Sequence, residues 1–434
     1  MCPVPPPPAA PTTLDYPVAQ HTLANGLRVV VSPDSAAPAV TVNLWYDVGS
    51  RHEAPGRSGF AHLFEHVMFQ GSANVARSEH IALVQGCGGT ANATTWFDRT
   101  NYFQTVPVGA FELAVWLEAD RLGTLLDALT QESLDNQREV VKEEKRQRYD
   151  NVPYGDVLER MVALTFPADH PYGHTTIGSM ADLDAASLDD VRDFFRTHYL
   201  PSNAVLTVVG DVTVERALAV VERELGGLSD AVRPPHPRPA PLPPISGEPH
   251  QEVRADLPAD AVHLSWRLPA LDTDVFDALD LALGVLGDGQ TARLHQRLVR
   301  REQLAESATA ASLGLIGGTS FGYLAARARD GVGIDRVTDT LLAELERLRA
   351  DGPTPEELDR VKAQHERAWL QALSRIDARA DHLGRAATLL GDPTEVNRRV
   401  ARVRAITPDQ VHQAAAAWLD PASRATLVHL RENR

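Results

Sequence analysis

The chain of 434 residues is long enough for several domains with a large core, and its 43% apolar residues are usual for a soluble protein. Its formal net charge of −16, from 58 acidic and 42 basic residues, argues against nucleic acid or an anionic membrane surface as a partner, because their phosphates would be repelled. No apolar run approaches the roughly 20 residues that cross a bilayer.

The N-terminal segment, residues 1–20, begins with a run of prolines and lacks the basic and apolar parts of a signal peptide. We therefore expect a flexible, extended leader. The chain has 2 cysteines, too few for a disulfide framework, which is consistent with a cytoplasmic location. A secretory signal that has already been removed is the alternative.

The first long strand pattern, residues 39–48, leads into a segment bounded by Gly56 and Gly71. Apolar side chains surround this segment when it is drawn as a helix: Phe60, Leu63, Phe64, Val67, Met68 and Phe69. Glycines before and after such a pattern predict a short buried helix between two breaks.

This helix carries His62 and His66, which lie four residues apart and therefore share one face. Glu65 lies beside the second histidine and could reach a water on a metal ion without binding the ion itself. The order is the inverse of the His-Glu-x-x-His motif of zinc proteases. The parts suit peptide hydrolysis, because a metal acidifies a water and a carboxylate removes its proton. The alternative is a charged helix surface with two unrelated histidines.

A catalytic zinc needs a third protein ligand, and the two cysteines are too scattered for a thiolate site. The helical segment 136–148 offers the best candidates. Glu144 lies one turn beyond Val140, whose apolar side chain suggests that their common face looks inward. Glu143 is the competitor, and spacing does not decide between the two.

The rest of the chain contains both strand patterns and helix patterns. Strand patterns cover 27–32, 39–48, 101–106, 204–209 and 262–268, and helical patterns cover 109–127, 132–148, 155–165, 213–226, 335–350 and 354–375. This mixture predicts an α+β fold in which helices pack on a largely antiparallel sheet.

The chain also repeats itself. A capped helix, turn and strand that begin at Ser187 recur from Thr407, which lies 220 residues later. A proline-rich segment, 231–247, separates the two copies and is expected to be an extended linker. We therefore expect an N-terminal domain at 21–230 that carries the metal motif and a homologous C-terminal domain at 248–434 that lacks it.

The motif from His62 to His66, followed by the segments 88–95 and 137–146, resembles the pitrilysin/insulinase family of zinc peptidases. The most similar branch is the mitochondrial-processing-peptidase type, in particular its bacterial proteases with two half-domains. The resemblance covers nearly the whole chain, from Asn25 to Leu427, and its motifs are specific in the N-terminal half and loose in the C-terminal half.

The resemblance implies that His62, His66 and Glu144 bind one zinc ion per chain and that Glu65 is the general base. It also implies two homologous half-domains that face each other like a clam shell around the zinc. In many relatives the position of Gln137 is a glutamate that supports the site, so this chain departs from the family there.

The family pattern also assigns residues 91–94 to an edge strand beside the metal, with Asn92 and Ala93 as substrate-binding residues. Such a strand can pair with a substrate peptide through main-chain hydrogen bonds. The Asn92 amide could also donate to the scissile carbonyl oxygen. The alternative for Asn92 is an ordinary turn residue after two glycines.

The chain lacks an arginine and a tyrosine that active relatives contribute from the C-terminal half. Val299 stands at the arginine position and Glu306 at the tyrosine position, while Arg300 and Arg301 are out of register. The resemblance therefore suggests a heterodimer in which a related subunit without zinc ligands supplies this pair, with a homodimer as the other possibility.

The predicted function is a zinc-dependent endopeptidase that hydrolyses peptides or unfolded segments, in which Glu65 activates a zinc-bound water. The alternative is a non-catalytic peptide-binding or scaffolding subunit of a larger complex. The intact motif argues against this alternative, because a scaffold has no reason to keep Glu65 beside both histidines.

Overall fold

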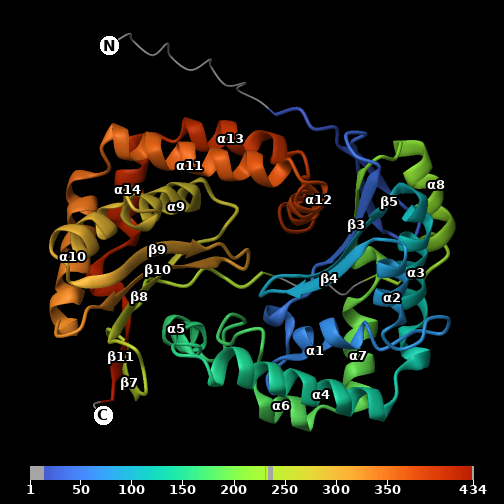
Figure 1. Ribbon diagram of the computed structural model, residues 1–434, viewed down its shortest axis with the longest axis horizontal. Coiled ribbons are helices and arrows are strands. Elements are labelled where there is room, and N and C mark those ends of the chain that lie inside the picture. Colours follow the sequence, from blue (N-terminus) through green and yellow to red (C-terminus); the bar gives the residue numbers. More distant parts are fainter. Residues whose placement is uncertain (1–13, 230, 233–237, 433–434) are drawn as a thin grey trace.

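A computed structural model describes residues 14–229, 231–232 and 238–432. It shows two halves, each a sheet covered by helices, whose sheets face one another across the middle of the molecule (Figure 1). The predicted α+β architecture of two largely antiparallel half-domains is confirmed. In the part of the chain that the structure describes, no helix is long and apolar enough to cross a membrane.

The sheet of the N-terminal half has the strand order β1-β2-β6-β3-β5-β4. Its strands are β1 (Ala19–Thr22), β2 (Arg28–Pro33), β3 (Ala39–Tyr46), β4 (Thr90–Thr95), β5 (Thr100–Pro107) and β6 (Ala204–Gly210). Its helices are α1 (Phe60–Val67), α2 (Glu79–Gly86), α3 (Phe111–Ala128), α4 (Gln131–Lys145), α5 (Val157–Thr165), α6 (Met180–Ala185), α7 (Leu188–His198) and α8 (Val214–Leu225).

The sheet of the C-terminal half has the order β7-β11-β8-β10-β9. Its strands are β7 (His250–Ala255), β8 (Ala261–Pro269), β9 (Ala305–Leu313), β10 (Thr319–Ala328) and β11 (Ala425–Arg431). Its helices are α9 (Asp274–Gly287), α10 (Ile334–Asp351), α11 (Pro355–Leu373), α12 (Ile376–Arg385), α13 (Glu395–Ala405) and α14 (Pro408–Trp418).

The two sheets have the same topology. In each, one central strand pairs parallel with one neighbour and antiparallel with the other: β6 with β2 and β3, and β11 with β7 and β8. The repeated capping signals also form, because Ser187 accepts a hydrogen bond from the Asp190 amide and Thr407 accepts one from the Gln410 amide. The two copies read from the sequence are therefore one structural unit used twice.

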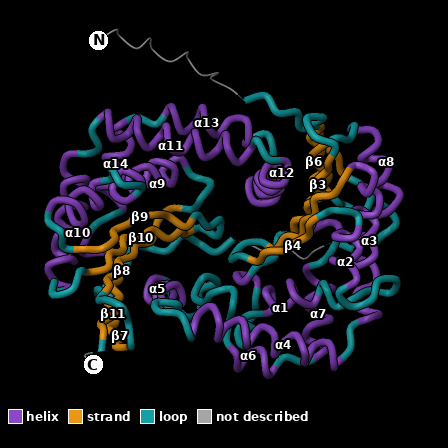
Figure 2. The backbone as a smooth tube through the Cα atoms, in the orientation of Figure 1, coloured by secondary structure: helices purple, strands orange, loops and turns teal. Residues whose placement is uncertain are grey.

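One helix of each half packs on the sheet of the other half. Helix α12 of the C-terminal half covers the inner face of the first sheet, where Leu383 packs with Trp45 and Val205. Helix α5 of the N-terminal half covers the second sheet in the same way, where Met161 packs with Leu427. Figure 2 shows both helices on the sheet faces that look toward the middle of the molecule. This exchange joins the halves through two apolar cores.

The prediction of a flexible leader is wrong for residues 14–20. Residues 1–13 lie outside the described residues, but residues 14–20 are packed against the rest of the chain instead of being free. The backbone of Tyr16 exchanges two hydrogen bonds with the side chain of Asn397 in α13, and Ala19 begins β1. Apolar side chains at 14, 16 and 18 explain the difference, because they join the core beneath α12.

The linker prediction concerns residues 231–247, of which 233–237 lie outside the described residues. The described residues 238–247 contain no helix or strand and lie against the C-terminal half. The Leu242 amide donates to the Thr319 hydroxyl (2.8 Å), and Arg238 pairs with Asp272 (2.6 Å).

We predict that Gly384→Ala destabilises the contact between the halves. A Cβ at this position of α12 would lie 2.6 Å from Cδ1 of the buried Trp45. Overpacking of this kind costs about 1–3 kcal/mol. Thermal denaturation should show a lower Tm, whereas the matched change Gly86→Ala at the end of α2, where no atom lies within 4 Å, should leave the Tm unchanged or higher.

Candidate metal centre

Helix α1 is held in place at its N-terminus by a buried carboxylate. The helix begins after Gly59, whose φ of 94° is left-handed. Glu53, with a fully buried side chain, accepts hydrogen bonds from the amides of Gly59 (2.9 Å) and Ala61 (2.8 Å) and pairs with His174 Nε2 (2.8 Å). The negative charge suits the positive end of the helix dipole. Glu53 thereby fixes the orientation of the helix that carries both histidines.

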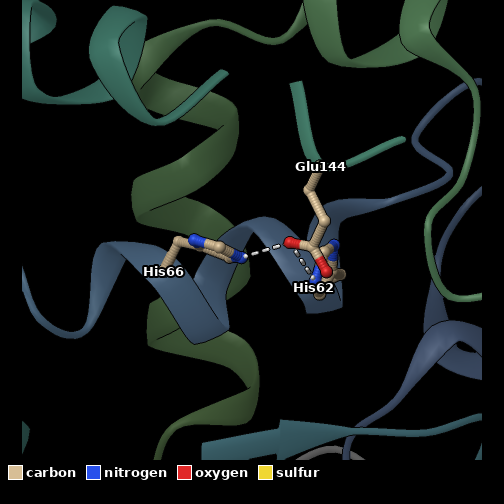
Figure 3. Close-up of side chains that lie close together, drawn as sticks. All are labelled: His62, His66 and Glu144. Atoms are coloured by element: carbon tan, nitrogen blue, oxygen red, sulfur yellow. Dashed lines mark ion pairs between the residues drawn. The ribbon is translucent and has the colours of Figure 1, made fainter. Parts of the chain in front are cut away.

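Helices α1 and α4 bring two imidazoles and one carboxylate together. His62 Nε2 lies 3.5 Å from Glu144 Oε2, and His66 Nε2 lies 3.2 Å from the same oxygen. The imidazole rings are 4.9 Å apart at 88°, and one ligand atom from each of the three residues lies within 4.8 Å of the others (Figure 3). The three side chains are 12%, 21% and 16% exposed, respectively.

The spacing of these atoms fits a tetrahedral zinc ion. Zinc binds nitrogen and oxygen donors at about 2.0–2.2 Å, which places neighbouring donors of a tetrahedron about 3.3–3.6 Å apart. The two measured separations are 3.2 and 3.5 Å. Among the residues that the structure describes, these three form the one group of His, Cys, Asp or Glu that could hold a metal ion. The donor set and the two separations from Glu144 Oε2 are therefore compatible with zinc.

The local electrostatics favour the ligand forms of these groups. Burial, helped by the charge of His66, lowers the pKa of His62 to about 4, so this imidazole is neutral and able to bind a metal at neutral pH. The bond to His66 lowers the pKa of Glu144. Arg148 donates to Glu144 Oε1 (2.6 Å), which leaves Oε2 facing the histidines.

The structure shows which of the two candidate glutamates, Glu143 or Glu144, lies beside the histidines. Glu144 lies at the site, whereas Glu143 is 52% exposed and bonds to Arg146 (2.9 Å). The supporting argument from Val140 was wrong, because Val140 is 41% exposed. The inward face of α4 instead carries Val141, which lies three residues before Glu144 and is fully buried.

Gln137, which replaces the glutamate of many relatives, lies on the same inward face of α4 and is 5% exposed. It stands seven residues, about two helical turns, before Glu144. A neutral amide at this buried position adds no charge to the centre.

Glu65 lies next to this cluster on α1. Burial raises the pKa of the Glu65 carboxyl, and the charge of Glu144 adds to the rise, whereas Thr95 and His66 oppose it. A buried carboxylate with a raised pKa is a stronger base than one in water, as a general base requires. Its catalytic role stays a prediction.

The strand β4 lies at the edge of the sheet, as the resemblance implied. Asn92 is exposed and Ala93 is buried, and the Ala93 amide donates to Asn92 Oδ1 (2.9 Å). Side chains alternate along a strand, so Ala93 and Thr95 share the face toward α1 and Asn92 looks the other way. Thr95, at the end of β4, interacts through its side chain with Glu65, so this end of the strand lies beside the proposed base. The roles of Asn92 and Ala93 in substrate binding stay predictions.

The segment that was expected to carry the family's arginine and tyrosine contains neither residue at these two positions. Val299 packs against the C-terminal core, and Glu306 at the start of β9 forms an ion pair with Arg327 (2.7 Å). Neither side chain can replace a guanidinium or a phenol in binding an oxyanion.

Sequence reasoning missed the residues that support the ligands: Glu53, His174 and Arg148. The available signal for Glu53 was its place shortly before a helix start, where a carboxylate is favourable. Its bond to His174 joins positions 121 residues apart, which no local pattern shows.

Comparisons with known proteins identify the family of the chain. A family model described as insulinase (peptidase family M16) matches residues 28–179, and one described as peptidase M16 inactive domain matches residues 185–365. The chain is 31% identical over 377 residues to the zinc protease PqqE of Helicobacter pylori, an alignment that covers 85% of this chain and 82% of that protein. It is 28% identical over 416 residues to an uncharacterized zinc protease of Streptomyces coelicolor, covering 92% of this chain and 86% of that protein.

Solved structures show the same fold. The crystal structure of a protease from Helicobacter pylori has a TM-score of 0.89 and 27% identity and covers 96% of this chain and 99% of that chain. A structure described as a peptidase M16 inactive domain, from Pseudomonas fluorescens, has a TM-score of 0.86 and covers 96% of this chain and 98% of that chain; at 16% identity this similarity concerns the fold alone. From the fold, the arrangement of His62, His66 and Glu144 and these matches, the chain belongs to the insulinase family of peptidases, family M16.

Proposed function

We propose that the chain is a zinc-dependent endopeptidase that hydrolyses peptides or unfolded segments. The observation that carries the proposal is the convergence of His62, His66 and Glu144, with Glu65 beside them in a largely buried setting. The relatives named zinc proteases support the same class of reaction.

His62, His66 and Glu144 would hold one zinc ion per chain. When bound, zinc supplies a Lewis acid that acidifies a water and polarises the substrate carbonyl. Glu65 would take a proton from the water as the water oxygen adds to the carbonyl carbon. It would then deliver this proton to the amine nitrogen, so that the C–N bond breaks after the C–O bond has formed. The carboxylate returns to its starting state, and no other reactant is needed.

The edge strand β4 would hold the substrate. Its main chain can form hydrogen bonds with an extended peptide whatever the peptide's side chains are. The Ala93 amide now donates to Asn92 Oδ1, so a substrate strand would take over this donor and release the Asn92 side chain. Because the two halves face each other around the site, this binding mode suits short or unfolded peptides.

The second part of the proposal concerns a partner. Val299 and Glu306 leave the chain without the arginine and tyrosine of active relatives. A related subunit that lacks zinc ligands would supply them in a heterodimer, and a homodimer is the other arrangement.

We predict that Glu65→Gln abolishes hydrolysis but not zinc binding, because Glu65 is a base and not a ligand. Loss of a general base should lower the cleavage rate by about 10²–10⁴-fold. Zinc per chain is measured by elemental analysis, and cleavage by mass spectrometry of a diverse peptide mixture. Cleavage at the parental rate would show that Glu65 is not the base.

A second pair of variants tests the ligands. Glu144→Gln should weaken zinc binding by at least about 10–100-fold, since loss of a ligand should exceed the effect of losing an outer partner. Glu143→Gln is the matched control and should bind zinc like the parent, because Glu143 is exposed and faces away. Competition with a chromogenic chelator measures both affinities. Equal losses in the two variants would contradict the assignment.

The partner is tested by comparing the purified chain with co-expressed candidate pairs on the same peptides. We expect the pair to cleave faster, because it contains the missing arginine and tyrosine. Equal rates per zinc would make the partner unnecessary.

A further inference from the structure

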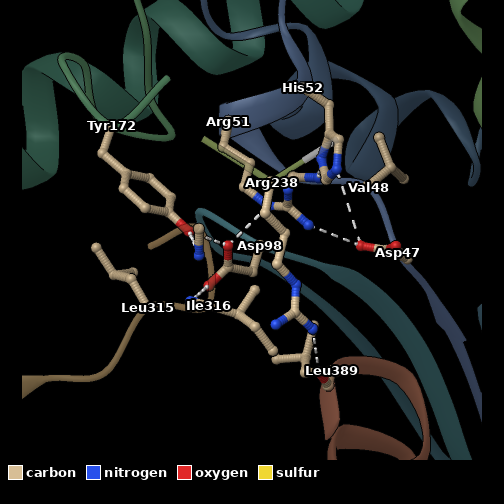
Figure 4. A network of polar contacts seen from close by, with 12 residues as sticks. Asp47, Val48, Arg51, His52, Asp98, Tyr172, Arg238, Leu315, Ile316 and Leu389 are labelled. Atoms are coloured by element: carbon tan, nitrogen blue, oxygen red, sulfur yellow. Dashed lines mark hydrogen bonds and ion pairs between the residues drawn. The ribbon is translucent and has the colours of Figure 1, made fainter. Parts of the chain in front are cut away.

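The turn that joins β4 to β5, residues 96–99, is held by the C-terminal half. Asp98 in this turn is 2% exposed and accepts hydrogen bonds from the Ile316 amide (3.1 Å) and from the Tyr172 hydroxyl (2.5 Å), and it pairs with Arg51 (2.8 Å; Figure 4). Ile316 belongs to the loop between β9 and β10. One end of the candidate substrate strand is therefore attached to the opposite half of the molecule.

A second connection runs from the end of β4 to α12. Arg99 donates to the carbonyl oxygen of Thr94 (2.8 Å) and to Asn101 Oδ1 (2.9 Å). Asn101, which is fully buried, donates in turn to Asp381 Oδ1 on α12 (3.2 Å) and to Asn43 Oδ1 (3.0 Å). Arg99 and Asn101 thus link the last residues of β4 to a carboxylate of the C-terminal half.

The charge of Arg99 relates this link to Glu65, the proposed base. Burial lowers the pKa of Arg99, and the carboxylates of Asp381 and then Glu65 oppose this decrease. The Arg99 guanidinium also lies over the Trp45 ring, 5.1 Å from its centre. The buried Arg99 guanidinium is therefore close enough to interact electrostatically with Glu65 in the N-terminal half and with Asp381 in the C-terminal half.

Attachment of α12 to the first sheet does not need this charge. Leu383, Ala380 and Gly384 already pack on that sheet, around Trp45. Buried opposite charges add little net stability compared with apolar packing. Asp381 reaches the end of β4 by accepting the hydrogen bond from Asn101 (3.2 Å), whose side chain is bonded to Arg99 (2.9 Å). We therefore assign Asp381 to holding β4 in position, since the apolar residues of α12 already dock the helix on the sheet.

We infer that Asp381 is a positioning residue of the proposed peptidase site: through Arg99 and Asn101 it holds the end of β4, where the peptide is received and Thr95 lies beside Glu65. The inference rests on the proposed function and deepens it. It gives the half without a metal motif a part in substrate binding.

Asp381→Asn tests the inference because it removes the charge and keeps the size. Hydrogen exchange of the backbone amides of residues 92–99, measured without substrate, should become about tenfold faster as the turn opens more often. With zinc content unchanged, the KM for peptides should rise and kcat/KM should fall by about 10–100-fold, as expected when a substrate is held slightly out of place. Asp381→Glu, which restores the charge, should recover part of the loss.

Asp377→Asn is the matched control on the same helix. Asp377 accepts a hydrogen bond from the Ala378 amide (2.9 Å) and pairs with Arg375 away from β4, so exchange and kinetics should match the parent. Circular dichroism and the Tm establish that each variant is folded.

The inference is overturned if Asp381→Asn leaves both exchange at 92–99 and KM unchanged, if it loses zinc, or if it unfolds, since Asp381 would then act elsewhere or only in folding. If the parent cleaves no peptide, with or without candidate partners, the proposed function fails. The exchange measurement would still decide whether Asp381 holds β4.

Discussion

The structure depends on bringing His62, His66 and Glu144 together in a largely buried place. Two imidazoles and a carboxylate would be costly there without a cation, because buried polar groups need partners. The protein holds them from outside the cluster: Glu53 fixes the start of α1, and Arg148 occupies the second oxygen of Glu144. These contacts fix the positions of the three side chains, and side chains that are already held in place lower the cost of ordering them around a metal ion.

The duplicated architecture explains how one half can carry the chemistry and the other can support it. Apart from the additional strand β1, the two sheets have the same strand order, and each is covered by a helix from the opposite half. In the first sheet this helix is α12, which places Asp381 beside the end of β4. Loss of metal ligands from one copy thus does not make that copy dispensable.

Much of the fold could be predicted from local patterns. The strongly periodic helices α10 and α11 and the apolar strands β3 and β6 formed close to their predicted bounds. Strands β9 and β10 gave no such signal, because they are rich in alanine, which does not favour strands in isolation. Their conformation is decided by tertiary structure: β10 pairs with β8, β9 pairs with β10, and the two strands pack against helices α9 and α10.

The sequence by itself determined that His62 and His66 share a helix face with Glu65 beside them, because helical periodicity is a local property. Spacing left Glu143 and Glu144 open, and the resemblance favoured Glu144. Only the tertiary structure placed Glu144 against the histidines and Asp381 near β4, since those contacts depend on how distant segments pack. The separation of 280 residues between Asn101 and Asp381 leaves no trace in any local pattern.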